Sequence, residues 1–427
     1  MADVAPIECD LAVVGRGMAG MAATLFAANR GISTVQVGMT GEIIFSSGCM
    51  DLLAFPSSER EAPFDDPWAA VERLSQEMPE HPYTRMKREE IETAFEEIVS
   101  FLNRQGLPYV NQSGQNEEMI TPLGTVKQTY YAPESMWEGI KAFKEKAPCL
   151  LVDFYGMSDF SATQMAATLK DLWPEIRSAR VSFPGNSENR ELIPGDIMAE
   201  TMELSKNREE LAQAISPLVA NAQVVGVPAV MGMKGTREIL ADLKDRIGVS
   251  VFEIPTFPVS VPGLRLNEAF AQGLLEKGVK RLLQTRVLKV DSLKDGTFAL
   301  HVGRKAPEMT LHARGVILAT GRFWSRGLVA ERDGIREPIF SLPVHQPEER
   351  GQWHQERFLD LKGHPVNQAG LEIDVLFRPL DESGDPAFER LFAAGAILAH
   401  QDWKRMKCGS GLGISTAYKA VNAFLEE

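Results

Sequence analysis

The stretch CDLAVVGRGMAGMAATLFAANRGISTVQV, from Cys9 to Val37, decides the fold of this chain. It begins with a short apolar run, Asp10–Val14, of the length expected for a buried parallel strand. A glycine-rich turn follows without a gap, and then an alanine-rich segment, Met21–Asn29, that favours a helix. Ser33–Val37 is typical of a second strand. This order predicts one βαβ unit.

Three glycines in this stretch have the spacing GxGxxG, and each has a physical reason. Gly15 permits the tight turn from strand to helix, Gly17 lets the backbone come close to a phosphate, and Gly20 lets the helix pack on the strand. The helix N-terminus adds unpaired N–H groups and a partial positive charge. The motif predicts a bound dinucleotide or flavin nucleotide, the alternative being a purely structural turn.

One feature of such sites is missing from the second strand. A carboxylate about 20 residues after the glycines normally accepts hydrogen bonds from an adenosine ribose. Here the strand ends Val35-Gln-Val-Gly-Met-Thr40, and the next acid, Glu42, comes too late. Either Gln36 or the backbone holds the ribose, or the ligand is a mononucleotide without an adenosine half. The motif indicates a nucleotide and leaves its identity open.

Four further segments carry candidate cofactor contacts. Small hydroxyl residues after the second strand let backbone approach a bound ring, although an N-cap and turn explains them equally well. An apolar strand, Arg314–Leu318, closes on Ala-Thr-Gly321, and a late strand ends at Gly395. A glycine-rich loop then opens the last helix, where Lys404, Arg405 and Lys407 would stabilise negative charge on a reduced flavin ring, or else are solvated lysines and arginines at a helix start. The candidate cofactor-binding residues are Gly15, Gly17, Gly20, Ser46, Ser47, Gly48, Thr320, Gly321, Gly395, Gly409, Ser410, Gly411 and Gly413.

The predicted fold class is α/β, a Rossmann-like flavoprotein domain of the FAD/NAD(P)-binding type with an inserted α/β domain. Residues 1–55 and 260–427 are expected to form the discontinuous flavin-nucleotide-binding domain. Residues 56–259 are expected to form the insertion, because apolar strands at Cys149–Gly156, Val224–Gly232 and Val249–Ile254 alternate there with helical segments.

Composition limits the class of protein. The chain has 45 Lys and Arg against 58 Asp and Glu among 427 residues, a net charge of −13, which argues against a nucleic-acid surface. Its four cysteines form no CxxC pair and have no histidine at ligand spacing, so neither a zinc nor an iron–sulfur site is expected, and a reducing cytoplasm fits. There is no signal-peptide pattern and no apolar run of membrane-spanning length.

Two features leave the chemistry open. The loop Gly321–Pro338 is dense in arginine and glycine, which favours recognition of an anion or a partner, with internal Arg–Glu pairing as the alternative. No residue stands out as a proton-abstracting base. His345 and His354 lie in a late loop, where a histidine is more often a satisfied surface or core residue.

Five segments, in order along the chain, resemble the B subunit of the anaerobic glycerol-3-phosphate dehydrogenase. They are SSGCMDLL (46–53), HPYTRM (81–86), TPLGTVKQT (121–129), GRFWSRGLVAERDGIREPI (321–339) and CGSGLGISTA (408–417). The resemblance covers nearly the whole length, and the fourth segment is too unusual to match by chance.

The resemblance implies a flavin-dependent subunit of a cytoplasmic heterodimer with a catalytic A subunit, which oxidises sn-glycerol 3-phosphate to dihydroxyacetone phosphate. It also implies a third, iron–sulfur C subunit that brings the dimer to the inner membrane and passes electrons to quinone, in fumarate or nitrate respiration on glycerol. The family is assigned FMN. Where flavoprotein cores have Gly-Asp, this chain has Gly395-Ala396, which disfavours conventional FAD binding.

Two other functions remain open at this point. One is a self-sufficient flavin dehydrogenase or reductase, with FAD as the alternative cofactor. The other is a scaffold subunit that binds no flavin.

Overall fold

The computed structural model describes residues 5–39, 41–56, 62–186 and 192–426. The chain forms two compact units. The first comprises Met1–Glu42, Asp51–Phe101 and Phe270–Glu427, and the second comprises Ile43–Met50 and Leu102–Ala269.

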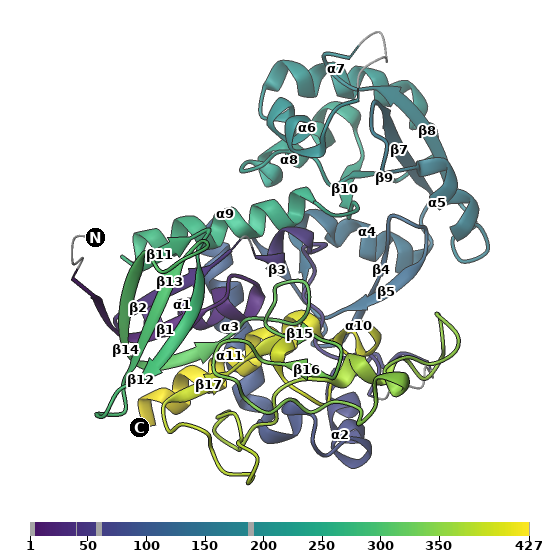
Figure 1. Cartoon of the computed structure of the whole chain (residues 1–427). Coiled ribbons are helices and arrows are strands. Elements are labelled where there is room, and N and C mark those ends of the chain that lie inside the picture. Colours follow the sequence, from purple (N-terminus) through teal and green to yellow (C-terminus); the bar gives the residue numbers. More distant parts are fainter. Residues whose placement is uncertain (1–4, 40, 57–61, 187–191, 427) are drawn as a thin grey trace. The chain divides into compact units, whose positions relative to one another are not determined.

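A seven-stranded sheet forms the centre of the first unit (Figure 1). Its strands, in spatial order, are β11 (Lys280–Leu283), β2 (Thr34–Gly38), β1 (Ile7–Val14), β14 (Met309–Leu318), β13 (Phe298–Gly303) and β12 (Arg286–Ser292), with β17 (Leu391–Ala393) also paired to β14. Strands β11, β2, β1 and β14 pair with one another in parallel, and β17 is parallel to β14. Strand β13 is antiparallel to β14, and β12 is antiparallel to β13. The predicted βαβ unit and the Rossmann-like fold are confirmed.

Helices α1 (Met18–Asn29) and α11 (Gly409–Glu426) pack against each other in the first unit. The rings of Phe26 and Tyr418 meet edge to face at 5.3 Å. Helix α3 (Arg88–Arg104) joins both, because Arg30 of the α1 C-cap pairs with Glu97 at 3.2 Å and Lys419 pairs with Glu90 at 2.7 Å. Shorter elements of this unit are α2 (Pro67–Glu77), α10 (Trp403–Met406), β15 (Val329–Ala330) and β16 (Ile335–Arg336).

The second unit has a four-stranded parallel sheet in the order β10, β9, β7, β8. Its regular elements are β3 (Tyr109–Val110), β4 (Glu117–Ile120), β5 (Val126–Thr129), β6 (Ala132–Pro133), α4 (Glu134–Glu145), β7 (Cys149–Tyr155), α5 (Ala162–Leu169), β8 (Ile176–Ser182), α6 (Gly195–Met202), α7 (Ser205–Ile215), β9 (Val224–Pro228), α8 (Thr236–Ile247) and β10 (Ser250–Ile254). Its core includes the fully buried rings of Phe154, Trp173 and Phe183. The predicted strands and the α/β character of this region agree with the structure.

The boundaries of the two units differ from the expected ones at 55/56 and 259/260. Residues 56–101 belong to the first unit, since α3 is tied to α1 and α11 by the ion pairs above. Residues 43–50 and 260–269 belong to the second unit. The chain passes from the second unit back to the first within helix α9 (Val261–Glu276), between Ala269 and Phe270.

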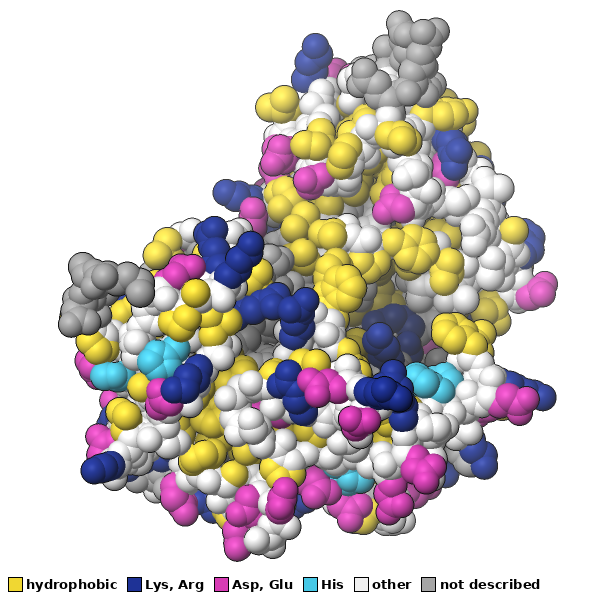
Figure 2. Space-filling view, in the orientation of Figure 1, with side chains coloured by type: hydrophobic (Ala, Val, Ile, Leu, Met, Phe, Trp, Pro, Cys, Tyr) yellow, Lys and Arg dark blue, Asp and Glu magenta, His cyan; other side chains and the backbone are white. Residues whose placement is uncertain are grey.

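The surface of the first unit carries both signs of charge. Figure 2 shows acidic side chains gathered along its lower edge in that view, with Lys and Arg interspersed above them. Among the helices of the described residues, none is long and apolar enough to cross a membrane. The four cysteines are buried, and none of them forms a disulfide among the described residues.

Candidate functional site

The first glycine loop has close backbone contacts at Gly15 and Gly20 and free space beside Gly17. Gly15 has φ +138°, and a Cβ on it would lie 2.0 Å from the carbonyl oxygen of Ala319. A Cβ on Gly20 would lie 2.3 Å from the oxygen of Gly15. Gly17 is the N-cap of α1, and within the described residues no atom lies within 4 Å of its Cβ position. Gly17 therefore leaves open space at the helix N-terminus, where a phosphate could lie. Gly41 packs on the other side of the loop, with its Cβ position 3.0 Å from the Gly17 amide nitrogen.

The second predicted signal, Thr320-Gly321, follows β14 directly beside this loop. The amide of Ala319 donates to Val14 at 2.9 Å, which holds the end of β14 against the end of β1. Thr320 is buried, and its hydroxyl has no hydrogen-bond partner among the residues that the structure describes. Gly321 has φ +66°, and a Cβ there would lie 2.5 Å from Ser325 Oγ. An orphaned buried hydroxyl next to an open phosphate loop fits a polar ligand.

Gly395 and Gly413 meet at the N-terminus of α1. Gly395 has φ +77°, and a Cβ on it would lie 2.6 Å from the Cβ of Ala19 and 3.8 Å from the Cα of Gly413. Its amide donates to the Thr416 hydroxyl at 2.8 Å. A Cβ on Gly413 would lie 3.2 Å from the amide nitrogen of Ala19. The structure thus brings Gly15, Gly17, Gly20, Thr320, Gly321, Gly395 and Gly413 together around one helix end.

Gly409, Ser410 and Gly411, at the start of α11, make contacts within the first unit. Ser410 Oγ accepts from the amide of Asp51 at 2.7 Å, and the amide of Gly411 donates to the Asp51 carbonyl at 2.8 Å. A Cβ on Gly409 would lie 2.8 Å from the Trp403 ring. These contacts give the three residues a packing role, and their contact with a flavin ring stays a prediction.

Ser46, Ser47 and Gly48 belong to the second unit. Ser46 Oγ accepts from the amide of Gly48 at 3.1 Å, and the Gly48 carbonyl accepts from the Tyr109 hydroxyl at 2.6 Å. Gly48 has φ +86°. These hydrogen bonds are those expected of a turn, one of the two interpretations of this segment. Contact between these three residues and a bound flavin ring stays a prediction.

Gln36 does not face a ribose. Its side chain is fully buried, its amide nitrogen donates to the Gly15 carbonyl at 3.1 Å, and its oxygen accepts from Arg281 Nε at 2.9 Å. The Glu42 carboxylate bonds to Ser325, which lies beside Gly321, and burial raises the pKa of Glu42. The structure therefore offers no ribose-binding carboxylate at the end of β2 within the described residues.

Two arginines lie at this point instead, and sequence reasoning missed them. The stem of Arg16 lies 3.0 Å from the Cβ position of Gly38, at the end of β2, and its Nε has no partner among the described residues. Burial, with the charge of Arg16, lowers the pKa of Arg281 to about 10. Neither arginine forms an ion pair within the described part of the chain. A pair of partly buried cations without an ion-pair partner favours an anionic ligand.

Two arginines of the arginine-rich loop have partners in the structure, one of them outside the loop. Arg322 donates to the carbonyls of Ala396 at 2.8 Å and Gln401 at 2.9 Å, and also to that of Asn367. Burial lowers its pKa to about 10. Arg336 forms an ion pair with Glu331. Arg322 therefore holds the backbone before and after strand β17 in place. Ala396, one of its partners, stands where flavoprotein cores usually have an aspartate.

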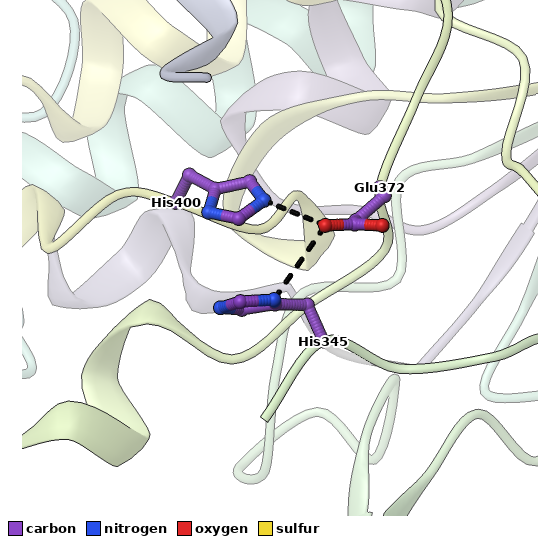
Figure 3. Close-up of side chains that lie close together, drawn as sticks. All are labelled: His345, Glu372 and His400. Carbon is purple, nitrogen blue, oxygen red and sulfur yellow. Dashed lines mark hydrogen bonds and ion pairs between the residues drawn. The ribbon is translucent and has the colours of Figure 1, made fainter. Parts of the chain in front are cut away.

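A cluster of two histidines and a glutamate lies in the first unit (Figure 3). His400 Nε2 is 2.9 Å and His345 Nδ1 is 3.5 Å from Glu372 Oε1. The sequence pointed to His345 alone, because Glu372 and His400 come from separate loop segments. His354, the other histidine considered, stacks instead with His364 at 5.3 Å.

The second unit contains a cavity of about 380 Å³, lined in part by Glu134, Arg237, Lys244 and Arg265. Both of these arginines are already paired. Arg237 contacts Glu134 at 2.6 Å, and Arg265 contacts the buried Glu253 at 2.6 Å. The cavity therefore favours no particular class of substrate.

Comparison with known proteins agrees with the geometry. A protein-family model described as an FAD binding domain matches residues 10–412. The B subunit of anaerobic glycerol-3-phosphate dehydrogenase from Vibrio vulnificus is 32% identical over 429 residues, which cover 97% of this chain and 96% of the relative. The corresponding B subunit of Aliivibrio fischeri is 28% identical, over 98% and 95% of the two chains.

Among solved structures, 3-ketosteroid delta1-dehydrogenase from Sterolibacterium denitrificans aligns with a TM-score of 0.44 at 12% identity, over 98% of this chain and 100% of that chain. The family match and the full-length relatives together establish a flavoprotein oxidoreductase. This chain belongs to the FAD-binding-domain family and, within it, to the family of B subunits of anaerobic glycerol-3-phosphate dehydrogenase.

Proposed function

We propose that this chain holds the flavin that relays electrons from sn-glycerol 3-phosphate to a membrane quinone, within a complex that forms dihydroxyacetone phosphate. The activity for which its relatives are named supports this assignment. The observation that carries it is the open backbone at Gly17 beside the unpartnered hydroxyl of Thr320, within the described residues. A bound flavin supplies the chemistry of the relay, since it takes up an electron pair and can release the electrons one at a time.

The residues around α1 would hold the phosphate end of that flavin. The N-terminal amides of α1 and the cation of Arg16 stabilise a phosphate dianion, and the glycines keep side chains out of its way. Arg322 keeps the backbone from Ala396 to Gln401 in place against the same helix end.

The cofactor we propose is FMN, with FAD as the alternative. An adenosine ribose needs an acceptor at the end of β2, and that position has the stem of Arg16 packed on Gly38. Two cations there suit a terminal phosphate better than a ribose. The match to a family described as an FAD binding domain supports the alternative.

The proposed partners are a catalytic A-type subunit and an iron–sulfur C-type subunit that anchors the complex. We place this chain in the cytoplasm, at the inner membrane through that third subunit. The designation of the relatives as one subunit of a dehydrogenase supports partner binding. Three apolar side chains of the first unit, Phe358, Leu359 and Leu361, are 88, 84 and 72% exposed, which suits a contact surface for a subunit.

Turnover tests the relay. The purified chain, loaded with flavin, is assayed with sn-glycerol 3-phosphate and an artificial electron acceptor, alone and after addition of the A-type subunit. We expect no turnover by the chain alone and turnover by the pair. Turnover by the isolated chain would identify a self-sufficient dehydrogenase instead.

A further inference from the structure

The cluster His345, Glu372 and His400 has the composition and spacing of a metal site. Their three ligand atoms lie within 4.8 Å of one another, with 2.9 Å and 3.5 Å between the glutamate oxygen and the two imidazole nitrogens. Ligands at about 2.0–2.2 Å from one ion are separated by roughly 3 to 3.5 Å. Figure 3 shows both imidazole rings directed at the same carboxylate oxygen.

We propose that His345, Glu372 and His400 bind one divalent transition-metal ion of the Zn²⁺ class. Two imidazoles and one carboxylate suit borderline ions such as Zn²⁺, Fe²⁺ or Mn²⁺ and not the all-oxygen coordination that Ca²⁺ prefers. Three protein ligands leave at least one position open, which a water or a substrate oxygen takes. The sequence predicted no metal site, because the three ligands have no motif spacing.

The backbone around the three ligands is already fixed without an ion. His345 and Gly370 exchange two backbone hydrogen bonds, of 2.8 and 3.1 Å. Leu371 donates to Ile397 and accepts from Ala399, at 2.9 Å each, which holds the segment before Glu372 against the segment before His400. A preformed ligand set loses little conformational entropy on binding an ion.

Two backbone features allow this close approach. A Cβ on Gly370 would lie 2.5 Å from the Ile397 carbonyl oxygen, so only glycine lets the two segments meet. His400 itself has φ +58°, in the left-handed region that histidine tolerates better than most side chains. The backbone strain is located at a ligand, as it often is at functional sites.

A further buried histidine of the first unit has one ring nitrogen left unsatisfied within the described part of the chain. His81 is completely buried, and its Nδ1 accepts from the amide of Tyr83 at 3.1 Å, so its proton is on Nε2. That Nε2–H has no acceptor among the described residues, and a buried donor of this kind calls for a polar partner.

The site goes beyond the proposed relay, and His400 is five residues after Gly395 in the sequence. Arg322 binds the carbonyls of Ala396 and Gln401, which flank His400 in the sequence. An ion here would keep an open position for an oxygen ligand, such as a water or the oxygen of an anionic small molecule.

Metal content tests the proposal on the full-length chain. The protein is stripped with a chelator, dialysed against micromolar ZnSO₄ and analysed for zinc by mass spectrometry, with wild type compared to H345Q, E372Q and H400Q. The matched control is H301Q, because His301 bonds one carboxylate, Asp291, at 2.8 Å outside the three-ligand cluster. We expect one zinc per wild-type and control chain, and loss of most of that zinc from each cluster variant.

Equal zinc binding by wild type and the cluster variants would overturn the proposal, as would no zinc in wild type. X-ray absorption at the zinc edge of wild type keeps the test valid if a variant fails to fold. Two imidazoles with oxygen ligands support the site, and sulfur ligands contradict it. Flavin content is measured on the same samples, so that a failure of the proposed cofactor assignment is seen separately.

Discussion

Replacing Thr320 with valine tests whether its hydroxyl is reserved for the cofactor. Valine has nearly the same shape, so the change removes one polar group from a buried position. In the flavin-free protein that hydroxyl has no partner among the described residues, and an unsatisfied buried polar group costs about 1–3 kcal/mol. T320V should therefore raise the melting temperature of the flavin-free protein.

The same substitution should weaken flavin binding. A hydrogen bond from the hydroxyl to the cofactor contributes about 0.5–1.5 kcal/mol to the binding free energy. The flavin-free variant is also relieved of the unsatisfied hydroxyl, which makes its binding free energy still less favourable than that of wild type. Since about 1.4 kcal/mol is a factor of ten, we expect a Kd increase of roughly 10-fold or more. Fluorescence titration of the stripped protein with flavin measures the Kd, and thermal denaturation measures stability.

The matched control is T416V. The Thr416 hydroxyl accepts from the amide of Gly395 at 2.8 Å and donates to Leu412 at 2.5 Å. Its removal leaves the Gly395 N–H without that acceptor and should lower the melting temperature. If T320V is destabilising like T416V, or if it binds flavin as tightly as wild type, the assignment of Thr320 to the cofactor is wrong.

Three further outcomes follow from the structure. Alanine at Gly20 should abolish flavin retention and destabilise the protein, because its Cβ would lie 2.3 Å from the Gly15 oxygen, whereas G17A should leave stability unchanged, as thermal denaturation would show. Burial lowers the pKa of His81 from 6.5 to about 3, so the unfolded chain takes up a proton below pH 6.5 that the folded one does not. Stability should fall as pH drops from about 6.5 to 3, and H81N should show a shallower fall in denaturation curves; an unchanged slope would exclude His81 as a cause. F358S should weaken co-purification with a partner subunit without changing flavin content, and undiminished capture would remove Phe358 from the interface.

Much of the fold follows from local sequence. Gly15 and Gly20 are each required by a close backbone contact, and Gly17 leaves the helix N-terminus open, so the βαβ unit was predictable from their spacing. Strand β14 was predictable from its apolar run closing on Ala-Thr-Gly. These features depend on residues close together in the chain.

The unit boundaries and part of the site were not predictable in this way. Residues 56–101 join the first unit through ion pairs such as Arg30 with Glu97, whose partners are far apart in sequence. Arg281 reaches the end of β2 only because β11 pairs with β2. The same holds for His400 and Glu372, which loop contacts bring together without any sequence spacing that marks them.

The identity of the flavin tests the central claim most directly. The chain is purified, any chromophore is released by heat, and FMN and FAD are separated by chromatography. We predict close to one FMN per chain, lost in R16A. FAD would contradict the assignment of Arg16 and Arg281 to a terminal phosphate, and a chain that takes up neither flavin after reconstitution would contradict the relay function itself.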